Sequence, residues 1–336
     1  MSASAELPRI GVVIPYFQRR AGLLQRALSS ICAQEYRPVQ VVVVDDGSPR
    51  PAAEEITPTL RNAVPGLTVT RQANQGVAAA RNAALDALGE EVSAIAFLDS
   101  DDYWDPAHLR NAAVALSRGA DFFFANLWLE GTTTRKVDPY SELNPNPLVP
   151  EAPGIMRWAG SVAGLLAGPW RIMTSGVVFR RAVMPQVRFP RTLRAAGEDQ
   201  LVWWALMVRS SAIMYCPEPT VTYGTGGVGI WQHCAYDSMR HFRRAADEVR
   251  WIRQALTTYP LSPRERRFVQ DQIALHREEA LTSALHLLRL REENPLKEIV
   301  CLLRDDPMCA AYWCVALPKL LYTKLRHASL PSRPGS

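Results

Sequence analysis

Short apolar runs alternate with helical patterns over the first hundred residues of the chain. Runs of apolar residues are typical of strands buried on both faces of a mostly parallel sheet. The expected strands are residues 10–14, 39–44, 67–70 and 94–98. Helical spacing and an alanine-rich segment lie between them. The expected helices are residues 24–31, 52–62 and 76–88. This alternation predicts an α/β domain with right-handed crossovers.

The pattern continues less regularly beyond the fourth strand. The expected elements are a helix over residues 106–118, strands over 121–129 and 174–179, a long loop over 131–153, and a buried helix over 201–208. Asp105 is the expected cap of the first helix, with Pro106 in its first helical position. Glu198 and Asp199 precede the buried helix, where acidic residues suit the helix dipole. On spacing alone, this acidic pair is either a helix start or part of a site.

The last third of the chain carries the whole positive excess. Residues 1–234 hold 21 basic and 21 acidic side chains, whereas residues 235–336 hold 17 and 12, which accounts for the net charge of +5. A basic region is attracted to an anionic surface. Because no RNP, zinc-finger or helix-turn-helix signature accompanies it, we expect a lipid surface and no nucleic acid.

This basic region is expected to be helical. Ser262-Pro263-Arg264-Glu265 is a capping box, and Asn294-Pro295 and Asp306-Pro307 are expected to start two further helices. The last helix, residues 308–317, is nearly all apolar and contains Tyr312 and Trp313. Aromatic residues followed by a basic end favour a helix in the membrane interface. The alternative is a helix packed on its own domain or on a second subunit of a homodimer.

The remaining composition is that of an ordinary globular protein. The six cysteines form no CxxC pair and no framework spacing, which favours free thiols in a reducing compartment. Residues 1–9 lack the apolar core of a signal peptide, and no run reaches the length of a membrane-spanning helix. We therefore expect a cytoplasmic protein.

Asp99-Ser100-Asp101-Asp102 is the strongest candidate for chemistry. It follows the apolar run 94–98, so its carboxylates are expected at the carboxyl end of a strand, where α/β sheets bind ligands. Crowded carboxylates repel one another unless a cation lies among them, and oxygen ligands suit Mg²⁺ or Mn²⁺. The alternative is an acidic loop that caps the next helix, although Asp105 already supplies a cap.

Other polar groups are expected at the same edge of the sheet. Pro15-Tyr16-Phe17 and Asp45-Asp46 follow the first two strands, and an aromatic residue beside a carboxylate can hold a nucleobase. No P-loop is present, so a phosphate would be bound through metal and arginine. Residues 224–229 match G-x-G-x-x-G but lie late in the chain, and no second strand is expected after them. A flexible lid is the better interpretation of these glycines.

Five sequence blocks together resemble the ordered motifs of family 2 glycosyltransferases of the GT-A fold. The blocks are Val12-Val13-Ile14-Pro15-Tyr16, Val44-Asp45-Asp46-Gly47-Ser48, residues 74–82 (NQGVAAARN), Leu98-Asp99-Ser100-Asp101-Asp102 and Gly197-Glu198-Asp199. The resemblance covers about residues 8–225. The opening is similar to that of bacterial exopolysaccharide enzymes, including succinoglycan-type glucosyltransferases. The fold class implied is a Rossmann-like, mostly parallel sheet flanked by helices, with a helical C-terminal extension.

The resemblance implies a UDP-sugar donor site. Its implied members are Pro15 and Tyr16 around the base, Asp46 on the uracil, Asp99 on the ribose side, Asp101 as ligand of Mn²⁺ or Mg²⁺, Asp102 as its assistant or a donor-sugar contact, and Arg81 near the diphosphate. For Arg81, a surface or helix-packing role is the alternative.

The resemblance also implies the acceptor side. Asp199 would be the general base of an inverting transfer, and Glu198 would orient it or bind the acceptor. Trp170 is a candidate acceptor contact, although core packing explains it equally well. The chain departs from the family after Tyr223, where glycines replace a Tyr-Arg-x-His-like segment and His233 is the nearest basic candidate. No Gln-x-x-Arg-Trp segment follows Asp199, so we expect a single addition rather than processive synthesis.

The implied organisation is a catalytic domain over residues 1–234, divided into a nucleotide-binding half to 130 and an acceptor half from 131, followed by a helical region over 235–336. The expected acceptor is a lipid-linked exopolysaccharide on the cytoplasmic face of the inner membrane, and glucose is the favoured donor sugar. One alternative is a sugar-nucleotide nucleotidyltransferase, disfavoured because residues 15–20 contain no glycine. The other is a catalytically silent membrane-bound scaffold, disfavoured because the acidic motifs are intact.

Overall fold

The computed structural model describes residues 7–132, 150–152 (backbone only), 154–168, 171–225, 238–290 and 294–317. The chain divides into two compact units. The sheet unit comprises Met1–Arg194 and Glu198–Gln232, and the helical unit comprises Ala195–Gly197 and His233–Ser336. Each unit is described by itself.

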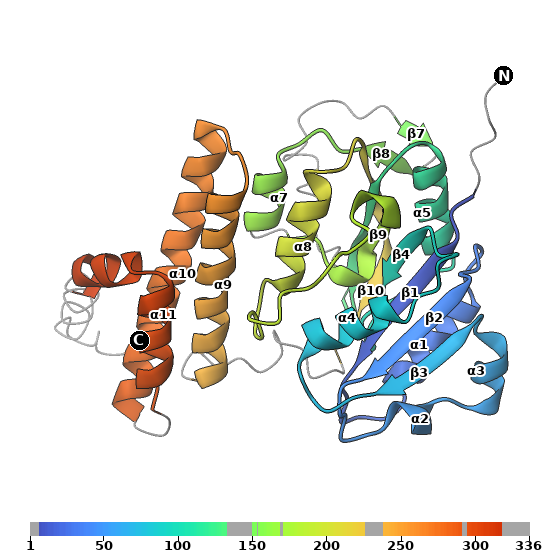
Figure 1. Cartoon of the computed structure of the whole chain (residues 1–336), viewed down its shortest axis with the longest axis horizontal. Helices are drawn as coiled ribbons and strands as arrows, with labels where there is room; N and C mark the ends of the chain where they lie inside the picture. The colour runs from blue at the N-terminus through green and yellow to red at the C-terminus, as the bar shows by residue number, and fades with distance from the viewer. Residues whose placement is uncertain are drawn as a thin grey trace, which may run out of the picture. The chain divides into compact units, whose positions relative to one another are not determined.

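The sheet unit is built on one sheet, in which the described residues form ten strands (Figure 1). Its first half is parallel, in the order β3 (Leu67–Arg71), β2 (Gln40–Asp45), β1 (Ile10–Tyr16) and β4 (Ala94–Phe97). All seven residues of β1 are buried, as the apolar run predicts for a strand covered on both faces. The four predicted strands are therefore confirmed.

The second half of the sheet is mixed. β9 (Val177–Arg180) lies antiparallel between β4 and β6 (Phe122–Leu129), and β10 (Ile213–Tyr223) runs parallel to β6. The remaining strands are β8 (Ile155–Arg157), β7 (Pro150–Ala152) and β5 (Tyr103–Trp104), all antiparallel to their neighbours.

Helices cover both faces of the sheet. Apolar residues of α1 (Leu23–Cys32) and α5 (His108–Ser117) share one core with Ile10, Val12 and Ile14 of β1. On the other face lies α4 (Val77–Asp86), and the segment that follows it packs so closely on β1 that a Cβ atom at Gly11 would meet Leu88. Trp203 of α8 (Glu198–Met207) packs edge-on against Phe97 of β4 on that face. The unit is thus a three-layer α/β structure, as predicted.

Two predicted helices differ in detail. The helix expected over 52–62 is broken into α2 (Ala52–Glu55) and α3 (Pro58–Ala63), because Thr57 caps the second helix through a bond from Leu60 N to its Oγ1. The helix expected from Pro106 begins at His108, with Ala107 as its cap. Asp105 Oδ1 instead accepts a bond from the Ala107 N–H, so the predicted helix start was two residues early.

Several elements of the second half were mispredicted or missed, among them the short strands β5, β7 and β8. Residues 174–176 form a 3₁₀ turn, η1, and only 177–180 are a strand. Strand β10 was not predicted, since Pro217 and Pro219 lie inside it and proline is unfavourable in an interior strand. The register against β6 shifts between Cys216 and Val221, which accommodates both prolines. The helix α7 (Val162–Ala167) was also missed. The predicted loop over 131–153 lies mostly outside the described residues.

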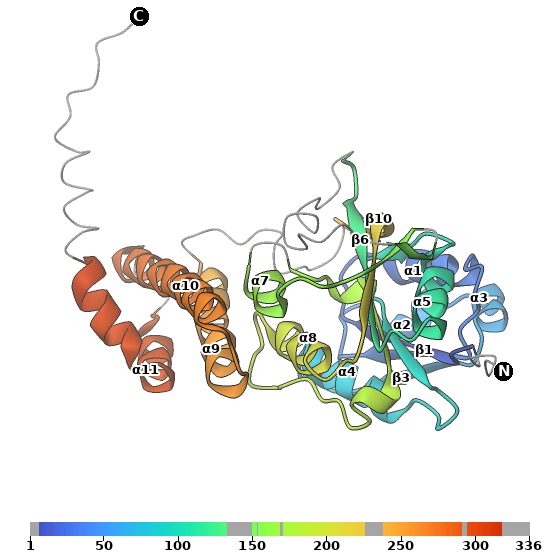
Figure 2. The same cartoon turned by 90° about the horizontal axis from the view of Figure 1, so that it is seen from above.

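The described residues of the helical unit form α9 (Met239–Thr258), α10 (Pro263–Leu290) and α11 (Leu296–Asp305), and residues 308–317 are also helical. Figure 2 shows α9 and α10 side by side. The capping box at Ser262 is confirmed, since Ser262 and Glu265 exchange backbone-to-side-chain bonds. No described helix is both long and apolar enough to cross a membrane.

The last helix is held on α10 by its aromatic residues. Trp313 Nε1 donates to the Arg277 carbonyl at 3.0 Å, and Tyr312 Oη donates to Glu278 at 3.3 Å. The polar tips of both side chains are therefore hydrogen-bonded within the helical unit. Met308 and Val315 remain about 60% exposed on the same helix. Its basic continuation lies outside the described residues.

Candidate active site

A pocket of the sheet unit gathers most of the predicted residues at the carboxyl ends of β1, β2 and β4. Its lining includes Pro15, Tyr16, Phe17, Asp46, Arg81, Asp99, Asp101, Thr174, Arg194, Glu198, Asp199 and Tyr223. Strands of a parallel sheet present their carboxyl ends at one edge, so groups that are far apart in the sequence meet there. Trp170 and His233 lie outside the described residues, and Asp102 does not line the pocket.

Asp99 and Asp101 line the pocket, as the acidic cluster predicted. Burial and the neighbouring Asp99 carboxylate raise the pKa of Asp101 to about 7. The Asp101 carbonyl accepts a bond of 2.8 Å from the Arg26 guanidinium, which also pairs with Glu130. Burial and the acidic cluster likewise raise the pKa of Tyr223. The end of β4 is thus a region where negative charge is crowded and a cation would be favourable.

Asp102 has a different environment. It is buried, and its carboxylate accepts bonds from Ser175 Oγ at 2.5 Å and from the Gly224 N–H at 2.9 Å. Burial and the neighbouring Asp101 raise its pKa well above the ordinary value. Gly224 passes so near the Asp101 carbonyl that a Cβ atom would lie 1.8 Å from its oxygen. Through these hydrogen bonds, Asp102 connects the loop 99–102 to η1 and to the end of β10.

The two acidic residues after β2 also differ in their contacts. Asp45 is buried and accepts backbone bonds from Ser48 and Ala52, so it fixes its own turn. Asp46 accepts bonds of 2.8 Å from the N–H groups of Gln75 and Gly76. Gly76 has φ +94°, a conformation that favours glycine. Gln72 Nε2 also donates to Asp46 Oδ1 at 2.8 Å, so Oδ1 accepts two bonds, whereas Oδ2 accepts one and retains a lone pair for a ligand. Asp46 thereby holds the loop before α4 at the pocket.

Phe17 contributes more of the aromatic lining of the pocket than Tyr16 does. The Tyr16 side chain is fully buried and forms part of the core beneath α1, and burial raises the pKa of its hydroxyl to about 12. Phe17, the next residue, is only half-buried and lines the pocket. Side chains alternate between the faces of a strand, so this alternation at the end of β1 could have separated the two residues.

Arg81 lies between the two acidic clusters. Its guanidinium forms ion pairs of 3.0 Å with Asp99 and 2.8 Å with Glu198, and its side chain is only 4% exposed. The guanidinium also lies over the ring of Phe189, 5.3 Å from its centroid. Arg81 is therefore not a surface arginine. It connects the end of β4 to the start of α8.

Glu198 and Asp199 open α8, as predicted, and both line the pocket. Asp199 is half-buried, and its Oδ2 accepts a bond of 3.0 Å from Thr174 Oγ1 in η1. Its Oδ1 accepts a bond of 2.7 Å from the Gln200 N–H. Burial and the neighbouring Asp199 raise the pKa of Glu198 to about 7, although Arg81 opposes this shift. In this pair, the Asp199 carboxylate is fixed by hydrogen bonds and partly accessible, whereas the Glu198 carboxylate is buried and paired with Arg81.

Arg194 is a pocket residue that the sequence analysis missed. It lines the pocket beside Gly76, and Arg191 of the same segment donates to the side chain of Gln75. Arg188, Arg191 and Arg194 recur at intervals of three before the acidic pair. This regular spacing of arginines was the sequence pattern from which Arg194 could have been predicted as a pocket residue.

The donor set at the pocket fits a divalent cation in one particular way. Among the described residues, no group of three or more histidine, cysteine or acidic side chains converges as a metal site. Mg²⁺ is commonly held by one or two carboxylates together with substrate phosphates. Asp101 supplies such a carboxylate, so the residues present fit a cation that arrives with a diphosphate.

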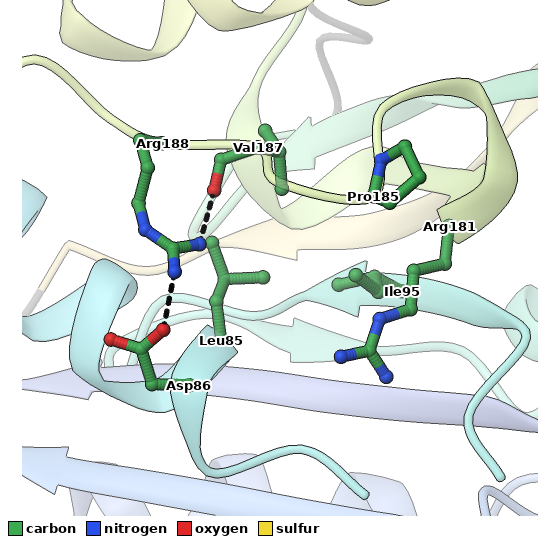
Figure 3. Close-up of a pocket in the computed structure, with 7 residues that line it drawn as sticks. All are labelled: Leu85, Asp86, Ile95, Arg181, Pro185, Val187 and Arg188. Atoms are coloured by element: carbon green, nitrogen blue, oxygen red, sulfur yellow. Dashed lines mark hydrogen bonds and ion pairs between the residues drawn. The ribbon is translucent and has the colours of Figure 1, made fainter. Parts of the chain in front are cut away.

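A second, smaller pocket lies elsewhere in the sheet unit. It is lined by Leu85, Ile95 and Val187 with the guanidinium of Arg188 beside them (Figure 3). Arg188 pairs with Asp86 at its rim. None of the predicted site residues lines this pocket, whereas most of them line the acidic pocket, which is therefore the candidate active site.

The fold and the pocket define an α/β protein with an acidic ligand site at the carboxyl edge of its sheet, and comparison with known proteins gives its family. Residues 11–169 match the model of glycosyl transferase family 2. The succinoglycan biosynthesis protein ExoW of Rhizobium meliloti (strain 1021) is 30% identical over 291 residues, which cover 83% of this chain and 87% of that protein. The chain belongs to glycosyltransferase family 2.

Further relatives are more distant. An uncharacterized glycosyltransferase of Nostoc sp. is 30% identical over 62% of this chain and 59% of its own length. Among solved structures, S. aureus TarS 1–349 in complex with UDP-GlcNAc superposes with a TM-score of 0.59 at 18% identity, covering 90% of this chain and 81% of that one. The complex of the same protein with UDP gives a TM-score of 0.57. These structures confirm the predicted GT-A fold.

Proposed function

We propose that this glycosyltransferase is a metal-dependent, inverting enzyme that moves one sugar from a UDP-sugar to an acceptor hydroxyl. One observation carries the proposal: Asp99 and Asp101 at the end of β4 line the same pocket as Asp199 at the start of α8. The buried guanidinium of Arg81 forms ion pairs with Asp99 and Glu198, so it connects the acidic residues after β4 to the acidic pair at the start of α8.

In the proposed donor site, Pro15 and Phe17 hold the uracil with Asp46, and Asp99 lies toward the ribose. Asp101 would ligate Mn²⁺ or Mg²⁺, and such an ion, when bound, neutralises charge on the departing diphosphate. Arg81 and Arg194 are the arginines that line the pocket among the described residues, and they would interact with that charge. The UDP and UDP-GlcNAc complexes of TarS support a uridine nucleotide as ligand. Asp102 acts beneath this site through Gly224 and not as a donor-sugar contact.

In the proposed reaction, Asp199 takes the proton of the acceptor hydroxyl as its oxygen bonds to the anomeric carbon. The bond from that carbon to the diphosphate oxygen breaks, and UDP leaves from the opposite face, so the configuration inverts. The hydrogen bond from Thr174 orients the Asp199 carboxylate, and a positioned base commonly contributes about 10² to 10⁴ in rate. Glu198, held by Arg81, orients this base or binds the acceptor.

The proposed acceptor is a lipid-linked exopolysaccharide intermediate, and glucose is the favoured sugar. The relative named for succinoglycan biosynthesis supports this pathway class. The absence of a Gln-x-x-Arg-Trp segment after Asp199 supports a single addition per encounter. Trp170 remains a candidate acceptor contact outside the described residues.

The test begins with hydrolysis of UDP-, GDP- and dTDP-sugars in the presence of Mn²⁺ or Mg²⁺. We expect turnover with UDP-sugars, loss of turnover with a chelator, and recovery when the metal is restored. Pyrophosphate release from a nucleoside triphosphate would instead identify a nucleotidyltransferase.

The base assignment is tested by Asp199→Asn. We expect UDP affinity to stay within about threefold while transfer falls by roughly 10² to 10⁴. Asp86→Asn is the matched control, because Asp86 is an exposed aspartate outside the active-site pocket. Transfer by Asp199→Asn at the rate of that control would refute the assignment.

We also propose that the helical unit attaches the enzyme peripherally to the cytoplasmic face of the inner membrane. The exposed Met308 and Val315 on the last described helix, and the positive excess of residues 235–336, support this attachment. A chain lacking residues 307–336 is expected to stop sedimenting with anionic liposomes while it still transfers to a soluble acceptor. Sedimentation of the truncated chain would refute the proposal.

A further inference from the structure

The short turn η1 is held firmly inside the sheet unit. The side chains of Thr174 and Ser175 are buried. Trp104 Nε1 of β5 donates to the Ser175 carbonyl at 2.7 Å. The turn also packs so closely on β6 that a Cβ atom at Gly176 would lie 2.9 Å from the Ala125 oxygen. All of these residues belong to the sheet unit, so η1 is a fixed point within it.

The Ser175 hydroxyl joins the two ends of the loop 99–102. Its oxygen accepts a bond of 3.0 Å from the Asp99 N–H, and its proton is donated to Asp102 Oδ2 at 2.5 Å. A hydroxyl has one donor and two lone pairs, so it can serve both groups at once. Asp101, the proposed ligand of the cation, lies between these two residues in the chain. Ser175 therefore limits where the backbone that carries Asp101 can lie.

The preceding side chain, Thr174, contacts the other half of the site. Its Oγ1 donates to Asp199 Oδ2 at 3.0 Å. A second contact joins the same segments, because Gln200 Nε2 of α8 donates to the Ile172 carbonyl at 3.1 Å. Asp199 and Gln200 also belong to the sheet unit. Two consecutive hydroxyls of one buried turn thus reach the loop 99–102 and the proposed base.

We propose that η1 sets the distance between the cation site and the base, with Ser175 and Thr174 as positioning residues for the two halves. This inference rests on the proposed roles of Asp101 and Asp199. An inverting transfer requires the acceptor oxygen, the anomeric carbon and the departing diphosphate to lie in line, so both halves must keep one geometry. A displacement of about 1 Å can lower a rate about 10²-fold.

The test compares Thr174→Val with Ser175→Ala in the full-length chain. Each variant removes one hydroxyl from the same buried turn, so a general loosening of η1 would affect both in the same way. We expect Thr174→Val to lower kcat for the hydrolysis of UDP-glucose with Mn²⁺ by about 10- to 100-fold, while the Kd for UDP with Mn²⁺ in calorimetry stays within about threefold. We expect Ser175→Ala to raise that Kd at least about tenfold, because two hydrogen bonds that hold the loop are lost, while kcat at saturating donor stays within about threefold.

Two further variants sharpen the comparison. Thr174→Ser keeps the hydroxyl and is expected to recover most of the kcat that Thr174→Val loses. Trp104→Phe keeps both hydroxyls but removes the donor to the Ser175 carbonyl, so it should lower kcat and raise the Kd together. It replaces Ser175→Ala in the test if that variant does not fold. The same change in Thr174→Val and Ser175→Ala, or parent values in Trp104→Phe, would overturn the inference.

The proposed function is checked alongside with Asp199→Asn and with UDP binding by the parent. If Asp199→Asn hydrolyses UDP-glucose at the parent rate, or if the parent binds UDP equally well with and without Mn²⁺, the proposed function fails. If Asp199→Asn is inactive and UDP binding requires Mn²⁺, parent affinity in Ser175→Ala refutes only the role of η1.

Discussion

Replacing Arg81 by methionine tests how the acidic pocket is held together. Methionine keeps much of the side-chain volume but removes the cation from two carboxylates. Arg81 and Glu198 are almost completely buried, with side chains 4% and 7% exposed. Removal of one partner from a buried ion pair costs about 3–5 kcal/mol, because the other charge stays buried without compensation. We expect this loss in the free energy of unfolding at pH 8.

The same reasoning predicts that the loss depends on pH. Burial and the neighbouring Asp199 already raise the pKa of Glu198 to about 7 against the effect of Arg81. Without Arg81, that pKa must rise further, so the folded variant binds a proton that the unfolded chain releases. At pH 5, Glu198 is protonated in both folded proteins, and the loss should shrink to about 1–2 kcal/mol, the value of the missing hydrogen bonds.

The assay is urea unfolding followed by tryptophan fluorescence at pH 5 and pH 8. Arg188→Met is the matched control, because Arg188 forms an exposed pair with Asp86 and should cost no more than about 1 kcal/mol. The double variant Arg81→Met/Glu198→Gln should be more stable at pH 8 than Arg81→Met alone. A cost equal to that of the control, or one that is the same at both pH values, would refute the reasoning.

Two further predictions concern neighbouring residues. Because the folded pKa of Glu198 lies above its ordinary value of 4.5, at about 7, the parent should lose stability as pH rises through this range. That loss is about 3 kcal/mol at 1.36 kcal/mol per pKa unit. Glu198→Gln should therefore gain stability relative to the parent between pH 5 and pH 8, as measured by thermal unfolding. A stability difference between the two proteins that is the same at both pH values would contradict this. Gly224→Ala should lower UDP-sugar affinity at least tenfold in calorimetry, because its Cβ would lie 1.8 Å from the Asp101 carbonyl oxygen; unchanged affinity would show that the loop moves freely.

The parallel half of the fold and the acidic edge of the pocket were predictable from the sequence. The runs 10–14 and 94–98 are apolar throughout, and parallel strands place the residues that follow them at one edge. Asp46, Asp99 and Asp101 are therefore brought together by topology alone. For Asp199, residue spacing alone did not decide between a helix start and a site residue. The order of the five family motifs made it a candidate site residue.

The other features depend on packing that no local pattern encodes. Strand β10 carries two prolines and forms only because a register shift beside β6 accommodates them. The separation of Asp102 from Asp101 depends on Ser175 and Gly224, which are 73 and 122 residues away in the chain. Likewise, the sequence around Gly197 indicates only a turn glycine, and its close contact with Trp251 is evident only in the structure. Contacts of such long sequence separation leave no periodic signal.

The partners of the carboxylates explain why they take different roles. Asp46 is held by two backbone N–H groups, Asp102 by Ser175 and Gly224, Asp199 by Thr174, and Asp99 and Glu198 by Arg81. Among the described residues, no arginine, lysine or histidine forms an ion pair with Asp101, although its pKa is raised by burial and by Asp99. A carboxylate that is crowded by like charge gains most from a cation, because the ion relieves both the burial and the repulsion. This difference supports Asp101, and not its neighbours, as the proposed ligand of the divalent ion.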